Sequence, residues 1–220
     1  MRERPNSNGL GGGLAAVMMA MVTAGLLAAC GGSPAAPATT TPPRSSPTAA
    51  SPSAAPTGGI FVRPGDPGWI VYSDPLNGFS FQAPVWMDDG TSDAMGQDPL
   101  VRVQVYNPLV TTTTSQVLVT ALQPGTTLPQ FVARTVSRLD QIPGFRGVQE
   151  RRRATLGGKP ATLIDWSASS NGATLIEREY LVVLDGKGYV VSMDTTPTPR
   201  DADFHTFALM MDRFRFGVGP

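Results

Sequence analysis

The stretch that decides the fold runs YSDPLNGFSFQAPVW, from Tyr72 to Trp86. Within it, residues 78–83 (GFSFQA) alternate apolar and polar side chains and then meet Pro84. This alternation is typical of a β-strand with one buried face, and a proline has no N–H for continued strand pairing. The stretch therefore predicts a short strand, with Trp86 just beyond its end.

The segments that follow predict more strands. Residues 101–106 alternate valines with polar or aromatic residues, which indicates a strand with one apolar face. Residues 116–122 are apolar at nearly every position, so this segment is expected deep in a sheet.

A β-meander is the clearest pattern in the chain. Strands are predicted at 147–156, 160–168, 173–184 and 189–194. The turns between them are Gly157-Gly158, Asn171-Gly172 and Asp185 to Gly188, and Asn-Gly is a strong hairpin signal. Four consecutive strands joined by tight turns predict an antiparallel sheet.

Two amphipathic helices are predicted beside this sheet. Residues 128–139 place apolar side chains on one stripe, Thr126 or Thr127 can cap the start, and Pro143-Gly144 follows the end. Asp201 is the expected cap of a last helix, whose buried stripe is Phe204, Phe207, Ala208, Met211 and Phe214. Asp203 is assigned to the same capping region rather than to a cation site.

Residues 60–220 form one domain of ordinary size. They contain all three Trp, all four Tyr and all nine Phe of the chain, which supplies a core. Strands with apolar residues on both faces need cover on both faces. We therefore expect an α+β fold in which an antiparallel sheet of about six strands is flanked by helices.

The order of these motifs resembles a known family. An aspartate, the GFSF strand, a proline and Trp86 resemble the opening of the PsbP/Mog1-like fold. The GGKPA turn (157–161), the REY and GYVV strands and the final FRF agree with it across residues 70–216. The resemblance implies an α/β/α sandwich and a non-enzymatic accessory or binding role. Together with the N-terminal features described next, it is similar to the LpqN-type lipoproteins of mycobacteria and their relatives, which are associated with the cell envelope.

The N-terminus has the order of a secretory signal. Arg2 and Arg4 precede an apolar run over 14–29, and the run ends in Leu27-Ala28-Ala29 before Cys30, the one cysteine of the chain. These four residues resemble a bacterial lipobox. We expect cleavage of residues 1–29 and lipidation of Cys30, with palmitate among the acyl chains, on the extracytoplasmic face of the cell membrane.

Two alternatives to the lipobox remain open at this stage. One is an uncleaved membrane anchor, although 16 helical residues rise only about 24 Å against a hydrocarbon core of roughly 30 Å. The other is an ordinary secreted protein without a lipid. A disulfide within the chain is excluded, because one cysteine has no partner.

Residues 30–59 form a linker between the lipid and the domain. After Cys30 this segment contains only Gly, Ser, Pro, Ala, Thr and one Arg. Such a composition buries too little apolar area to fold. We expect a disordered stalk that holds the domain away from the membrane.

Charge argues against a nucleic-acid partner. Three of the 17 basic residues and one of the 17 acidic residues precede residue 60, so the domain carries a net charge of about −2. A nucleic-acid-binding domain carries a basic field, which this composition does not provide.

No catalytic, cofactor or metal-binding motif is found in the sequence. His205 is the single histidine and is expected on the surface or edge of the last helix. Glu177 and Glu179 share a strand face, as do Arg151 and Arg153 on a nearby strand. We expect a solvated cross-strand ladder of these charges rather than an acid–base pair.

Aromatic residues beside an acidic loop provide the functional hint. Trp69 and Trp86 flank the first strand, and residues 87–99 form a long acidic loop that contains Asp88, Asp89 and Asp98. Long loops often carry function, and exposed Trp is enriched at binding sites. Trp69, Trp86, Asp88, Asp89 and Asp98 are the candidate partner-binding residues, with burial of both Trp in the core as the alternative.

The leading hypothesis is a lipid-anchored, non-enzymatic protein that binds an envelope protein used in assembly or transport, a membrane transporter being one candidate partner. The alternative is a carrier of a lipid or small apolar molecule. That carrier would need a pocket between sheet and helix, lined by Phe131, Val136, Phe207 and Met211.

Overall fold

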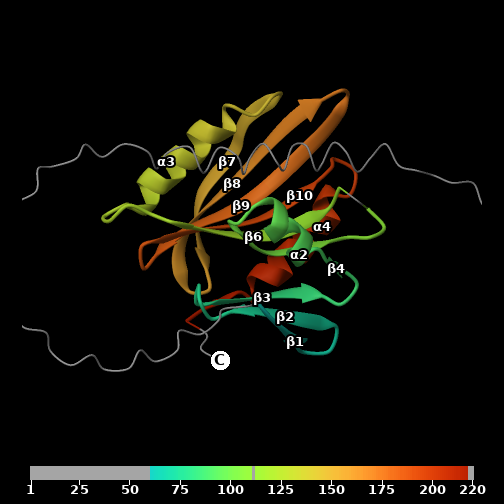
Figure 1. The fold of residues 1–220 in the computed structure, drawn as a ribbon. Helices are drawn as coiled ribbons and strands as arrows, with labels where there is room; N and C mark the ends of the chain where they lie inside the picture. The colour runs from blue at the N-terminus through green and yellow to red at the C-terminus, as the bar shows by residue number, and fades with distance from the viewer. Residues whose placement is uncertain (1–59, 111, 218–220) are drawn as a thin grey trace, which may run out of the picture.

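The computed structural model describes residues 60–110 and 112–217, whose strands form two antiparallel sheets (Figure 1). The larger sheet has the strand order β4-β5-β6-β10-β9-β8-β7 and the smaller one the order β1-β2-β3-β11. The larger sheet consists of β4 (Asp88–Asp89), β5 (Val101–Tyr106), β6 (Thr114–Ala121), β7 (Phe145–Leu156), β8 (Lys159–Ser170), β9 (Ala173–Leu184) and β10 (Lys187–Thr195). The smaller sheet consists of β1 (Phe61–Pro64), β2 (Trp69–Asp74), β3 (Phe79–Pro84) and β11 (Arg215–Phe216). The helices of the described residues are α2 (Thr91–Gln97), α3 (Leu128–Leu139) and α4 (Arg200–Met211).

Both faces of the larger sheet are covered. On one face, Phe131 of α3 packs in a cluster with Trp166 and Leu181 of the sheet. A Cβ added to Gly188 of β10 would lie 2.7 Å from the Phe131 ring, so the close approach of α3 requires a glycine there. Helix α4 and the smaller sheet cover the opposite face (Figure 1).

The predicted α+β fold class is confirmed. One antiparallel sheet of about six strands was expected; the larger sheet has seven strands, and the second, four-stranded sheet was not predicted. Most of the strands that were missed belong to the smaller sheet, whose strands have two to six residues. β1 is exposed along its whole length, so it carries no apolar alternation that a sequence reading can detect.

The segment over residues 87–99 is also not the long loop that we expected. It contains the short strand β4 and the helix α2. The N–H of Thr91 donates to Asp89 Oδ1 at 2.8 Å where the helix begins, and the N–H of Leu100 donates to Asp98 Oδ1 at 2.8 Å after it ends. Acidic side chains that suggested a loop therefore bond to the backbone at both ends of a helix.

The β-meander is confirmed with the predicted turns. Asn171 and Gly172 have φ angles of +51° and +79°, and Asp185 and Gly186 have φ angles of +50° and +73°. Two left-handed residues in a two-residue loop match the twist of antiparallel strands. The hairpins therefore follow from local sequence.

Helix α3 begins and ends as predicted. Thr127 and Gln130 form a reciprocal capping box, in which the Thr127 N–H donates to Gln130 Oε1 at 2.8 Å. The predicted cap of helix α4 is wrong: the N-cap position is Pro199, and Asp201 lies within the first turn of the helix, which begins at Arg200. Asp203 in its first turn is buried and accepts a hydrogen bond from Thr113 Oγ1 at 2.8 Å.

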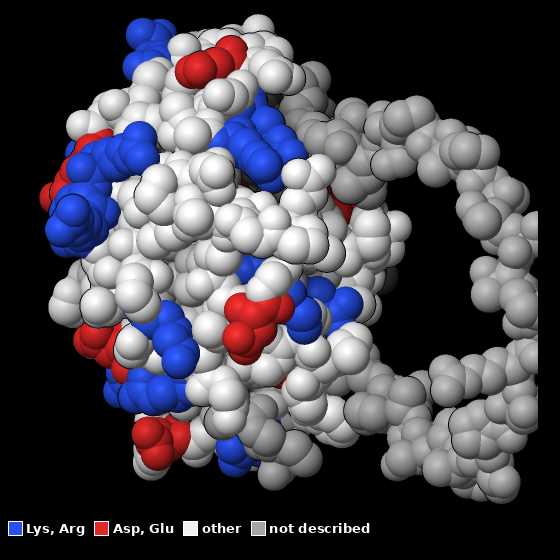
Figure 2. All heavy atoms as spheres, turned by 90° about the vertical axis from the view of Figure 1, so that its left-hand side faces the viewer, with Lys and Arg blue, Asp and Glu red and all other residues white. Residues whose placement is uncertain are grey.

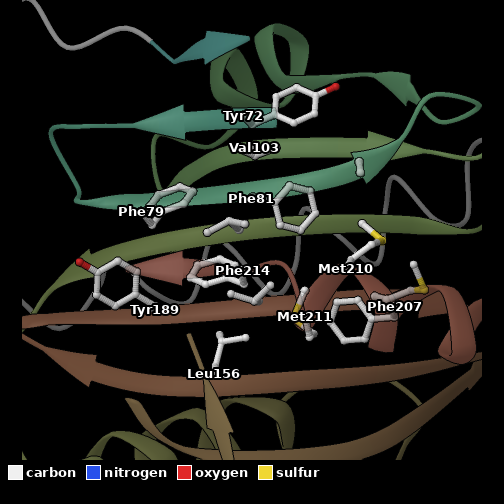
Figure 3. Packing of buried hydrophobic residues seen from close by; sticks show 14 of the residues in the cluster. Tyr72, Phe79, Phe81, Val103, Leu156, Tyr189, Phe207, Met210, Met211 and Phe214 are labelled. Carbon is white, nitrogen blue, oxygen red and sulfur yellow. The ribbon is translucent and has the colours of Figure 1, made fainter. Parts of the chain in front are cut away.

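Tyr72, Phe79 and Phe81 lie in the main core (Figure 3). Phe79 is fully buried and stacks on Phe214, with ring centroids 5.7 Å apart and 9° between the planes. Tyr189 of β10 meets Phe79 edge-on at 6.4 Å. Phe79 therefore joins the smaller sheet, the larger sheet and the C-terminal end of the described chain.

Polar groups beside this core hold the two sheets in place. The buried carboxylate of Asp74 accepts from Arg102 Nε of the larger sheet at 2.7 Å. Tyr189 donates its hydroxyl to the backbone oxygen of Asn77 at 2.8 Å, and Lys187 Nζ donates to that of Leu76 at 2.9 Å. The turn between β2 and β3 is thus fixed on the larger sheet.

Replacing Phe79 with alanine is expected to destabilise the domain by about 3–5 kcal/mol, because it removes a fully buried ring and leaves a cavity between the sheets. Urea unfolding followed by tryptophan fluorescence measures this loss. The matched control is Phe61→Ala on β1, where the ring is 57% exposed and the expected change is about 0.5 kcal/mol or less. Equal losses for both variants would contradict this assignment of the core.

Candidate functional site

The sequence-predicted patch divides into exposed and buried members. Trp86 is 48% exposed and its neighbour Val85 is 56% exposed. Asp88 and Asp89 follow on β4, also exposed, at one edge of the larger sheet. We call these four residues the Trp86 surface: two adjacent large apolar side chains beside two carboxylates.

Trp69 and Asp98 do not join this surface as free groups. Trp69 is half-buried, and the guanidinium of Arg213 lies 4.1 Å from its ring centroid. Asp98 was expected to face a partner, and this is corrected: its side chain is buried and accepts the Leu100 N–H. The carboxylate is required by the backbone turn after α2 and is not presented on the surface.

The most unusual chemistry lies on the α3 side of the larger sheet. Glu177 and Glu179 on β9 and Asp194 on β10 are each 7% exposed or less. In the strand register, Glu177 faces Asp194 on one side and Trp166 of β8 on the other. We call Glu177, Glu179 and Asp194 the carboxyl cluster.

The carboxyl cluster is only partly satisfied by hydrogen bonds. Trp166 donates its indole N–H to Glu179 Oε1 at 2.8 Å. Within the described residues, Glu179 Oε2 and Asp194 Oδ1 have no hydrogen-bond partner. Buried oxygens without partners destabilise a fold, and carboxyl groups in this position relieve part of the cost by staying protonated.

Burial is the main cause of raised pKa values in this cluster. It raises the pKa of Glu177 well above its ordinary value, and the charges of Asp194 and Glu179 raise it further. Burial also raises the pKa of Glu179 to about 7, against the opposing effect of the Trp166 hydrogen bond. The pKa of Asp194 rises to about 6, again through burial. Folding therefore favours the protonated form of each of these three acids.

The predicted Arg/Glu ladder is wrong. Arg151 and Arg153 lie on β7, and β8 separates that strand from β9, which carries Glu177 and Glu179. Glu177 and Glu179 were predicted to be exposed to solvent because their side chains are charged. One sequence signal pointed the other way: residues 180–184 are apolar on both faces of the same strand, which indicates a strand covered on both sides.

The opposite face of the same strands carries an ion pair that the sequence did not suggest. Arg178 of β9 binds both carboxylate oxygens of Asp165 on β8, at 2.9 and 2.7 Å. Its guanidinium also lies 4.2 Å from the ring centroid of Phe204 on α4. Asp165 is buried, so this pair packs under α4 as a cross-strand link.

The carboxyl cluster can hold protons, because burial raises the pKa of each of its three acids. No group of three His, Cys, Asp or Glu side chains in the described ranges has a geometry that could hold a metal ion. His205 lies exposed on α4, as expected for a helix-surface residue. No histidine lies in the cluster, and the buried hydroxyl of Ser192 on β10, opposite Glu179 in the strand register, adjoins the glutamates. The raised pKa values make the cluster sensitive to protonation.

The four residues of the alternative ligand pocket do not line one cavity. Phe131 and Val136 of α3 belong to the cluster on one face of the larger sheet. Phe207 and Met211 of α4 belong to the core on the opposite face. The sheet lies between the two pairs, so the predicted pocket is corrected to two separate packing interfaces.

Charges on the surface are mixed where they can be seen. On the face shown in Figure 2, Lys and Arg side chains occur in small groups with acidic side chains between them. Cys30 and the segments at 1–29 and 30–59 lie outside the described residues. Among the helices of residues 60–110 and 112–217, none is long and apolar enough to cross a bilayer.

Comparison with known proteins identifies the class of fold. No protein-family model and no curated protein matches the sequence. The solution structure of cyanobacterial PsbP from Synechocystis sp. PCC 6803 is similar at a TM-score of 0.52 and 16% identity, covering 69% of this chain and 94% of that one. The chain therefore has the PsbP-like α+β fold that its sequence resemblance implied.

Two further solved structures are similar at lower TM-scores. LpqN of Mycobacterium tuberculosis, described as involved in cell envelope biogenesis, gives a TM-score of 0.49 at 16% identity over 64% of this chain and 83% of its own. The Ran-binding protein Mog1p of Saccharomyces cerevisiae gives 0.44 at 14% identity over 73% of this chain and 96% of its own.

Because of the carboxyl cluster, we expect the free energy of unfolding to fall as the pH rises. A carboxyl whose pKa is raised by folding binds more protons in the folded than in the unfolded state, so the free energy of unfolding decreases with pH between the two pKa values. For Glu179 this window runs from 4.5 to about 7. The expected loss is about 3 kcal/mol for a shift of this size. Urea unfolding at a series of pH values measures it.

Glu177→Gln is the variant that tests the source of this dependence. A neutral amide in place of Glu177 should raise stability at pH 7.5 and flatten the slope above pH 4.5. Glu150→Gln on the exposed strand β7 is the control and should leave the slope unchanged. A wild-type stability that increases across this window would contradict the raised pKa values.

Proposed function

We propose that this protein is a lipid-anchored, non-enzymatic protein of the extracytoplasmic membrane face that binds a protein partner in cell-envelope assembly or transport. The Trp86 surface is the observation that carries the binding half of the proposal. Cys30, at the end of a lipobox-like sequence, supports the anchoring half.

The Trp86 surface has the composition of a docking site. Val85 and Trp86 are adjacent and about half exposed, and an aromatic ring of this size adds much contact area at little entropic cost. Asp88 and Asp89 border them on β4. Carboxylates beside an apolar anchor match a partner that offers an apolar pocket with basic side chains at its rim.

The same surface is held on a rigid support. Met87 between the two halves is buried in the main core, and the Val85 N–H donates to the backbone oxygen of Gly68 at 3.0 Å. β4 pairs with β5, where Asp88 lies opposite Tyr106. Little order has to be gained when a partner binds such a surface, which favours affinity.

Lipidation of Cys30 tests the anchoring half. In cells fed a labelled palmitate, the wild-type chain should incorporate the label, and mass spectrometry should show a mature N-terminus at Cys30. Cys30→Ser should lose the label. An N-terminus that still contains residues 1–29, or cleavage without lipid, would contradict the proposal, since these are the uncleaved anchor and the plain secreted protein.

The binding half is tested in the same membranes after chemical crosslinking and detergent extraction. Wild-type protein should co-purify with a membrane protein, and the combined change Trp86→Ala, Asp88→Asn and Asp89→Asn should reduce recovery about tenfold or more. Asp201→Asn, on the exposed first turn of α4, is the control and should retain the partner. Full recovery with the triple variant would show that the partner binds elsewhere.

A further inference from the structure

Strand β7 forms the edge of the larger sheet opposite to β4. It is twelve residues long, and within the described residues no strand pairs with its outer side. An edge of this kind presents unpaired N–H and C=O groups and can accept a further strand.

A groove lies next to this edge, between the start of α3 and the strands β7 and β8. It has a volume of about 580 Å³ and is lined by Arg151, Arg152 and Arg153 of β7, Leu128 and Pro129 of α3, and Pro160 of β8, among others. We call it the β7 groove. Arg151 and Arg153 lie opposite Ile164 and Thr162 of β8, on the α3 face of the sheet, whereas the Arg152 side chain between them points to the opposite face. The groove therefore combines two guanidinium groups with apolar side chains, which suits an extended chain that carries both kinds of residue.

The positive charge of the β7 groove is largely uncompensated. Arg152 pairs with Glu150 at 2.7 Å. In the part of the chain that the structure describes, no acidic side chain forms an ion pair with Arg151 or Arg153. The domain as a whole is slightly acidic, so this groove is a local site of opposite sign. Its charge therefore selects an acidic partner.

We propose that the β7 groove binds an acidic, extended segment of a protein partner, which adds a strand to the edge of β7. Side chains at alternate positions of a strand lie about 7 Å apart, so acidic residues at alternate positions can meet Arg151 and Arg153 together. This surface and the Trp86 surface lie at opposite edges of the sheet, so both can be occupied at once.

The geometry favours a peptide over a phosphate or a lipid headgroup. The first turn of α3 offers few free donors to a phosphate, because Pro129 has no N–H and the Thr127 N–H is bonded to Gln130. A membrane surface could meet the arginines but could not use the unpaired backbone of β7. Charged side chains on an edge strand also repel most other strands, so pairing is restricted to a partner that neutralises them.

Binding of a defined peptide tests this proposal. The probe is a fluorescent eight-residue peptide that alternates Glu with Val, and the protein is the lipidated wild type in a nonionic detergent. Fluorescence anisotropy should show binding that weakens with added salt, and a peptide that alternates Lys with Val should not bind. Arg151→Ala with Arg153→Ala should weaken binding about tenfold or more.

Matched variants and a map of the bound site complete the test. Arg63→Ala, on the exposed edge strand β1 of the smaller sheet, should leave binding unchanged. Arg151→Glu with Arg153→Glu should lose the Glu peptide and gain the Lys peptide. Amide hydrogen exchange should slow along β7 when the Glu peptide is bound.

Three results would overturn the proposal: no binding of the Glu peptide, protection on another strand instead of β7, or arginine-dependent binding of phosphatidylglycerol vesicles or inorganic phosphate in place of the peptide. The Trp86 surface and Cys30 are unchanged in these variants. Failure here therefore leaves the proposed function standing, and loss of partner binding at the Trp86 surface leaves the β7 groove standing.

Discussion

The stacking of Phe79 on Phe214 is the contact on which the rest of the structure depends. Phe79 lies in the first third of the domain's strands and Phe214 directly after its last helix, so this contact closes the chain on itself. It holds the smaller sheet and α4 on one face of the larger sheet. Without that cover, the apolar side chains of β6, β9 and β10 on this face would be exposed to water.

Cover on both faces has a consequence for the polar residues of the central strands. Glu177 and Glu179 lie on β9 between β8 and β10, on the side where α3 packs. They are removed from water together with their apolar neighbours, and their pKa values rise because the charged form loses its hydration. The fold thus contains an acid cluster that is most stable when protonated.

Local signals in the sequence were sufficient to predict most helices and strands, but not which elements pack beside one another. The Asn171-Gly172 hairpin and the Thr127 cap depend on a few adjacent residues, and both were predicted correctly. The partners of Glu177 depend on strand order, which is set by contacts far apart in the chain. The burial of Asp98 was missed for a related reason. It follows from helix α2, whose seven residues are too few to show a helical pattern in the sequence, so the segment was interpreted as a loop. The exposure of Trp86 could not be predicted from residue type either, because tryptophans of this chain occur in both environments: Trp86 is about half exposed, whereas Trp166 is almost completely buried.

A domain with an aromatic surface at one edge of its larger sheet and a basic groove at the other suits the proposed role of binding proteins. The proposed function requires that Trp86 contacts a protein partner at the membrane, and site-specific photo-crosslinking tests this contact most directly. A benzophenone side chain placed at position 86 of the full chain in native membranes should give one discrete protein adduct, and the same group at the exposed position 205 on α4 should give none. Adducts to lipid alone at position 86, or equal protein adducts at both positions, would contradict the account.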